Sequence, residues 1–215
     1  GSTLSKLVDF SSPQQQQEFP TKGVRLSHLQ EFIQACGGDA ALQGLTTADV
    51  CEQFVKPWTQ SSQTSFCEWL EIQDHPAVGE ANVFISHAWK CCFLDVMDAI
   101  VTHLTEDGYS MKRVEDPVIW FCLFSNNQHR LDVLDFEWFN NTFQSSVARI
   151  GHVVMVMSPW NDPLPFTRSW CILEAYASTA HGCMFEIAMS KNDRLQFLDD
   201  VTSHCLLYTS PSPRD

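Results

Sequence analysis

Two residues four positions apart near the end of the chain pair an acid with an aromatic ring. Ser169 can cap a helix that runs to about Ala180, and Trp170 and Glu174 both lie within it. Residues four apart share one helical face, so the indole can stack on an aromatic ring of a ligand beside the carboxylate. By residue type alone, a solvated glutamate and a core tryptophan fit the same pattern.

A second group of chemically capable residues follows the apolar run at 83–86. Ser86, His87 and Trp89 leave the carboxyl end of this predicted strand and open a helix, whose amino end favours anions such as phosphates. A histidine hydrogen-bonded in a strand-end turn is an equally good interpretation of His87.

Three further residues complete the predicted ligand contacts. Phe124 ends the apolar run at 118–124, and Ser125 opens the polar loop that follows it. Arg168 directly precedes the helix predicted at 169–180. Loop residues of this kind also serve ordinary turns, and arginines often simply pair at the surface.

Strands alternating with helices must position these residues. Apolar runs at 83–86, 118–124, 152–158 and 184–189 predict buried strands, and helical spacing predicts helices around 93–104, 139–150, 169–180 and 193–201. Such spacing requires parallel crossovers. We therefore predict an α/β fold, an open parallel sheet flanked by helices on both faces and flavodoxin-like, with ligands bound outside the carboxyl ends of its strands.

The residues before 81 are organised differently. Residues 1–24, with their glutamine run, predict a flexible lead, and 25–80 predict a small helical extension and linker. Its helices are expected from Leu26 to Cys36, from Thr46 until Pro57 ends the helix, and around Ser65. The α/β domain spans 81–204, and 205–215 predict a non-native or disordered tail.

Composition excludes several classes of function. A net charge of −13 opposes binding to nucleic acid or anionic membrane. No apolar run approaches the roughly 20 residues that span a bilayer, so a cytoplasmic protein is expected. The nine cysteines include no Cys-x-x-Cys pair, which indicates small buried hydrophobes and no metal site.

In order and spacing, these fragments resemble a TIR domain over roughly residues 81 to 200. The resemblance is closest to TIR-like proteins whose first strand reads Phe-x-Ser-His-Ala-Trp, matched here by Phe84 to Trp89, and it includes Ser169-Trp170-Cys171-x-x-Glu174. It places the family's BB loop at 125–135. It also implies self-association through the TIR domain.

The resemblance implies that Glu174 is the catalytic carboxylate of an enzyme that splits the nicotinamide–ribose bond of NAD. NAD is then the substrate, and no cofactor is expected. Nicotinamide is already a cationic leaving group, so the barrier lies in forming the ribose oxocarbenium ion, which an anionic carboxylate stabilises. The reaction would be either hydrolysis or cyclisation.

Two other functions fit the sequence. A non-catalytic TIR module would recruit other proteins in signalling, although pure adaptors frequently lack the glutamate that this chain retains. A nucleoside-processing transferase would also set a carboxylate against a glycosidic carbon, and would accept nucleosides without the pyrophosphate.

Overall fold

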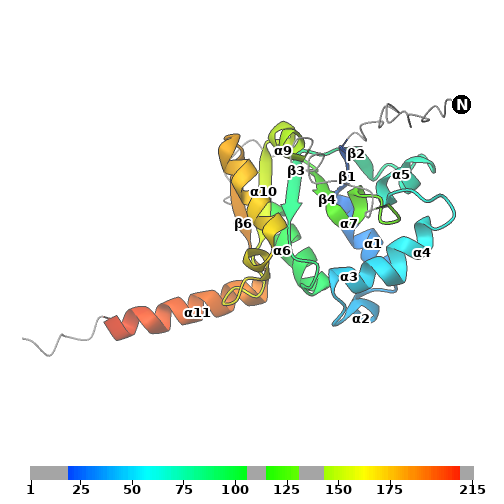
Figure 1. The fold of residues 1–215 in the computed structure, drawn as a ribbon. Coiled ribbons are helices and arrows are strands. Elements are labelled where there is room, and N and C mark those ends of the chain that lie inside the picture. The colour runs from blue at the N-terminus through cyan, green and yellow to red at the C-terminus, as the bar shows by residue number, and fades with distance from the viewer. Residues whose placement is uncertain (1–18, 106–114, 131–142, 209–215) are drawn as a thin grey trace, which may run out of the picture.

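The computed structural model describes residues 19–105, 115–130 and 143–208, without the side chains of 204–208. These residues form a six-stranded sheet in the order β2-β1-β4-β3-β5-β6 with helices on both faces (Figure 1). The four strands β3, β4, β5 and β6 are mutually parallel. They span Val83–Ser86, Val118–Phe121, His152–Val156 and Met184–Ala188. The predicted α/β fold class is confirmed.

Alternate residues of the central strands enter two separate hydrophobic clusters. Ile85, Ile119 and Val154 face one cluster, which includes apolar residues of α6 (Phe93–Thr105). Their neighbours Phe84, Trp120 and Val153 face the other, which α9 (Gln144–Ile150) and α10 (Ser169–Ala180) cover. The period-two alternation explains why these strands are apolar throughout, since both faces are buried.

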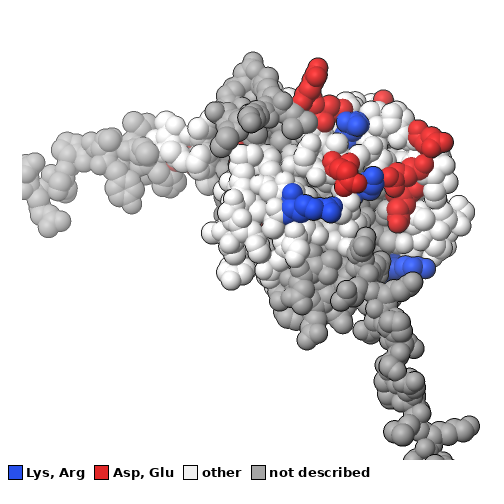
Figure 2. Space-filling view, turned by 90° about the horizontal axis from the view of Figure 1, so that it is seen from above, with Lys and Arg blue, Asp and Glu red and all other residues white. Residues whose placement is uncertain are grey.

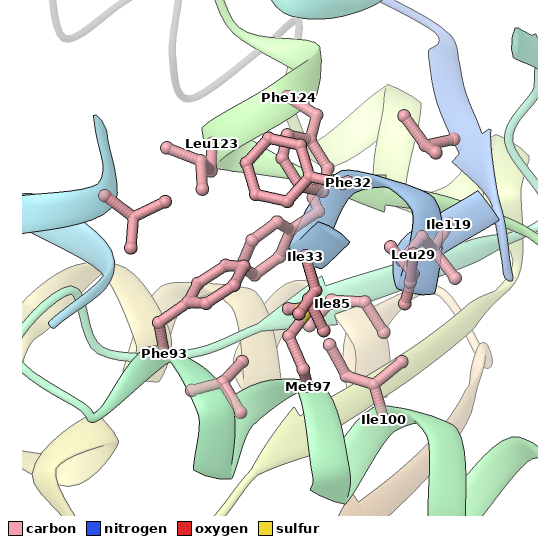
Figure 3. Packing of buried hydrophobic residues seen from close by; sticks show 14 of the residues in the cluster. Leu29, Phe32, Ile33, Ile85, Phe93, Met97, Ile100, Ile119, Leu123 and Phe124 are labelled. Carbon is pink, nitrogen blue, oxygen red and sulfur yellow. The ribbon is translucent and has the colours of Figure 1, made fainter. Parts of the chain in front are cut away.

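The helical extension packs on the same sheet face as α6. It consists of the short helices η1, α1, α2, α3, η2, α4 and α5, which span Leu26–His28, Leu29–Ala35, Asp39–Leu42, Thr47–Val50, Cys51–Val55, Lys56–Thr59 and Phe66–Glu71. Figure 3 shows Leu29, Phe32 and Ile33 of α1 packed with Phe93 and Met97 of α6 in one cluster. The predicted extension is therefore a layer of the domain's own core.

The two strands at one side of the sheet, β1 and β2, were not predicted. β1 (Lys22–Arg25) pairs antiparallel with β4 and with β2 (Val78–Glu80). Residues 22–24, placed in a flexible lead by the sequence, thus belong to the sheet; residues 1–18 lie outside the described residues. Gly23 allows the close pairing, because a Cβ there would lie 2.6 Å from the Ile119 carbonyl carbon.

Two of the predicted helices begin with a capping box, in which Thr46 pairs with Asp49 and Ser65 with Glu68. The predicted helix end at Pro57 is wrong, because the chain stays helical to Thr59. The turn preceding Pro57 is η2, a π-helix. Its wider winding accommodates a residue that lacks an N–H and crowds the preceding turn of an α-helix.

The remaining helices are α7 (Cys122–Ser125), η5 (Leu164–Thr167) and α11 (Lys191–Tyr208). In Figure 1, α11 projects away from the body of the molecule. Among the described residues, no helix combines the length and apolar character needed to cross a membrane. On the face shown in Figure 2, acidic side chains lie close to basic ones.

Candidate active site

The candidate site lies where the winding of the parallel strands reverses. Across the sheet the parallel strands stand in the order β4, β3, β5, β6. The chain therefore moves from β3 to β4 on one side of β3 and then crosses to β5 on its other side. Open α/β sheets bind ligands outside the carboxyl ends of strands at such a switch point. Ser86 ends β3 at this point.

Glu174 and Ser86 are brought together here from positions 88 residues apart. Ser86 is fully buried, pairs with Met155 of β5, and donates a short hydrogen bond from its Oγ to Oε2 of Glu174. Glu174 lies in the second turn of α10. The sheet thus fixes the direction in which the Glu174 carboxylate points.

The surroundings of Glu174 favour its neutral form. Although the residue is partly exposed, protein atoms surround its carboxylate closely enough that desolvation raises its pKa to about 7. The hydrogen bond from Ser86, the charge of Arg168 and a hydrogen bond with Cys171 act in the opposite direction and lower the pKa. Glu174 therefore changes charge near neutral pH.

Arg168 and Trp170 lie at the start of α10, before Glu174. Arg168 is the last residue before the helix, in an extended conformation, and its charge acts on both Glu174 and His87. Trp170 stands one helical turn before Glu174, with 39% of its surface exposed. The charge of Arg168 thus acts on the Glu174 carboxylate, whereas Trp170 is related to Glu174 by its helical spacing alone.

His87 is buried without a hydrogen bond. Neither ring nitrogen has a partner within the described parts of the chain, and the ring packs 4.5 Å from that of Phe121 between centroids. Burial first, and then the charge of Arg168, lower its pKa to about 3, so the imidazole is neutral. The interpretation of His87 as a hydrogen-bonded turn residue is wrong, because both of its ring nitrogens are buried and neither has a hydrogen-bond partner in the described chain.

Trp89 uses its polar atom within the protein. Its indole N–H donates to Sγ of Cys122 at 3.1 Å, and its backbone carbonyl accepts from the Ala48 amide of the extension. Trp89 is partly buried against the main cluster. It can offer a ligand only an apolar edge.

Phe124 and Ser125 do not reach the site. The predicted strand 118–124 ends at Phe121, and α7 turns both residues into the core. Phe124 is fully buried, 4.8 Å from Phe32 between ring centroids (Figure 3). The Ser125 hydroxyl accepts from the Phe121 amide. Their prediction as substrate-binding residues is corrected: the helical turn directs them toward the extension.

The polar loop after α7 binds the extension. Asn127 Nδ2 donates to the Gln63 carbonyl at 2.7 Å, and His129 Nε2 lies 2.9 Å from the Thr59 hydroxyl. These side chains hold the loop in place, and residues 131–135 of the predicted BB loop lie outside the described residues. In the part of the loop that the structure describes, the exposed Arg130 is the charged side chain that can still contact a ligand.

Two cysteines at the site were missed by the sequence analysis. Cys171 lies one turn before Glu174, lowers the pKa of its carboxyl, and donates its thiol hydrogen to the His87 carbonyl at 3.4 Å. Cys122 is close enough for the Glu174 charge to raise the pKa of its thiol, after burial as the main cause. The three-residue spacing from Cys171 to Glu174 could have predicted that both lie on one helix face. The position of Cys122 could not be predicted in this way, because only the tertiary fold brings it near Glu174.

Comparison of the chain with protein-family models, curated proteins and solved structures found no match. Within the described residues, no three histidine, cysteine or acidic side chains are placed to hold a metal ion together.

Proposed function

We propose that this protein is a TIR-type enzyme that cleaves the nicotinamide–ribose bond of NAD, with Glu174 as its catalytic carboxylate. The observation that carries the proposal is the Glu174 carboxylate, enclosed by protein and oriented by Ser86 at the switch point of the sheet. Acids with a perturbed pKa at such a position are typical of active sites.

The chemistry needs one anion and no general acid. As the C–N bond breaks, its electron pair leaves with nicotinamide, which becomes neutral, and positive charge grows on the ribose. Ionised Glu174 opposite that charge stabilises the transition state more than the ground state. Water then adds to the ribose carbon and loses a proton to give ADP-ribose, or an adenine nitrogen adds to give a cyclic product.

Ionisation of Glu174 near pH 7 suits a substrate whose reacting ring is cationic. The positive nicotinamide ring favours the charged carboxylate when NAD binds, so binding itself shifts Glu174 toward its active form. Arg168 is the basic residue beside the site that suits the pyrophosphate, and Trp170 offers its exposed indole to an aromatic ring of the ligand.

The test is NAD turnover by the purified protein at high concentration, with products separated by chromatography. We expect nicotinamide release that Glu174→Gln lowers by about 100-fold or more. Glu52→Gln, an exposed glutamate in η2, is the matched control and should leave turnover unchanged. Equal NAD consumption by Glu174→Gln and the unaltered protein would refute the proposal, and preferential cleavage of nicotinamide riboside would favour a nucleoside-processing transferase.

A protein-recruiting TIR module is the second candidate, and one observation favours it. Ile172 and Tyr176, four apart on α10, are 51% and 63% exposed on the helix face opposite Glu174. Such exposed apolar side chains suit contact with another TIR domain, and we propose self-association there. Sedimentation should show mass rising with concentration, and Tyr176→Glu should abolish the rise; association without NAD turnover would favour the module.

Both candidates place the protein in the cytoplasm. All eight cysteines that the structure describes are free thiols, five of them buried, which suits a reducing compartment where NAD is plentiful.

A further inference from the structure

A pocket lies in the extension, lined by residues other than those at Glu174. This pocket of about 300 Å³ opens between β1, α1, α4, α5 and the segment before β2. Its lining includes Glu31, Phe32, Trp58, Phe66, Trp69 and His75. Nothing in the proposed NAD chemistry uses this pocket.

Aromatic rings form its walls. Trp58 and Trp69 lie nearly parallel, 6.5 Å apart between centroids, and Phe66 lies nearly parallel to Trp69 at 5.6 Å. Phe32 meets Trp58 edge-on at 5.6 Å. Both tryptophans are only partly buried, so their rings offer apolar surface to a guest. Walls of this kind favour a flat ring, stacked or edge-on.

The rim is polar and carries a negative charge. Glu31 is exposed, with Oε2 3.8 Å from Nε2 of His28. His75 accepts the Ala77 amide at Nδ1, which leaves its Nε2 as a hydrogen-bond donor. The lining includes no lysine or arginine. A guest with a positively charged end is therefore matched by Glu31 and by the electron-rich faces of the tryptophans.

We propose that this pocket binds a small aromatic amine, with its ring against the aromatic walls and its ammonium group beside Glu31. The volume is at the lower end of small-molecule pockets and suits a bicyclic ring with a short chain. NAD itself is a poor guest, because its pyrophosphate would meet the Glu31 carboxylate in a protein of net charge −13.

The experiment compares three probes that share one ring system: tryptamine, neutral indole and anionic indole-3-acetate. Titration calorimetry on the full chain should give the order tryptamine, indole, indole-3-acetate from tightest to weakest. Glu31→Gln should weaken tryptamine by about 3- to 10-fold and leave indole unchanged. Glu52→Gln, at a glutamate outside the pocket lining, should change neither.

Nitrogen–proton correlation spectra locate the binding. Tryptamine should shift the indole N–H signals of Trp58 and Trp69 and leave that of Trp120, which donates to the Pro20 carbonyl, in place. The proposal would be overturned by any of three results: no saturable binding of tryptamine, equal binding of tryptamine and indole-3-acetate, or indole signals of Trp58 and Trp69 that do not shift. These measurements contain no NAD, so their outcome does not depend on whether the protein cleaves NAD.

Discussion

At the scale of single residues, the ionisation of Glu174 sets the expected pH dependence of NAD cleavage. Since the ionised form is the active one and its pKa is about 7, kcat/KM should rise with pH through that value and level off above it. Ser86→Ala removes a hydrogen bond that favours the charged form, so the midpoint should move about one unit higher. Rate profiles from pH 5.5 to 9 measure both midpoints, and a profile flat across neutrality would contradict the assignment.

The same residue links activity to stability. Its pKa lies above the unfolded value of 4.5, so the folded state holds the proton more tightly, and stability from this group falls as pH rises from 4.5 through 7. Allowing for partial exposure, Glu174→Gln should be about 1–2 kcal/mol more stable than the unaltered protein at pH 8, and about equal at pH 4.5. Urea unfolding at both pH values tests this prediction. If Glu174→Gln is less stable than the unaltered protein at pH 8, the ionised carboxylate of Glu174 does not destabilise the folded state.

At the scale of elements, the sequence predicted what local pattern specifies. The strands β3, β4, β5 and β6 stand out as buried apolar runs, and Thr46 and Ser65 mark helix starts by capping chemistry. β1 (Lys-Gly-Val-Arg) and β2 (Val-Gly-Glu) each contain a glycine, a single valine and at least one charged residue, and β1 pairs with β4 more than 90 residues away, so no apolar run indicates them. Likewise, Ser86 and Glu174 were both predicted at the site, whereas the turn that hides Phe124 depends on packing against the extension.

The closeness of β1 to β4 gives a test at this scale. In Gly23→Ala the new Cβ would overlap backbone atoms of Ile119, which no side-chain rotation can relieve, so the free energy of unfolding should fall by about 3 kcal/mol or more. Gly79, its cross-strand partner in β2, is the matched control. A Cβ at Gly79 meets first a Val118 methyl at 3.2 Å, so Gly79→Ala should cost less than about 1 kcal/mol. Equal losses in denaturant unfolding would mean that β1 does not pair as described.

At the scale of the whole molecule, the extension and the sheet share one hydrophobic cluster. Phe32 of α1 contacts Phe66 of the extension at 5.4 Å, Phe93 of α6 at 5.8 Å and Phe124 of α7 at 4.8 Å, between ring centroids. Because these contacts cross the boundary that the sequence placed near residue 81, the described parts of the chain should unfold as one cooperative unit.

Phe32→Ala tests that unity. Loss of the ring should destabilise the protein by about 3–5 kcal/mol, while Ile72→Ala, at a side chain 68% exposed, should cost less than about 0.5 kcal/mol. In hydrogen exchange, the slowest amides of β5 and those of α1 should lose protection by the same amount in Phe32→Ala, since both open only by global unfolding. If α1 loses protection while β5 keeps that of the unaltered protein, the extension unfolds as a separate unit.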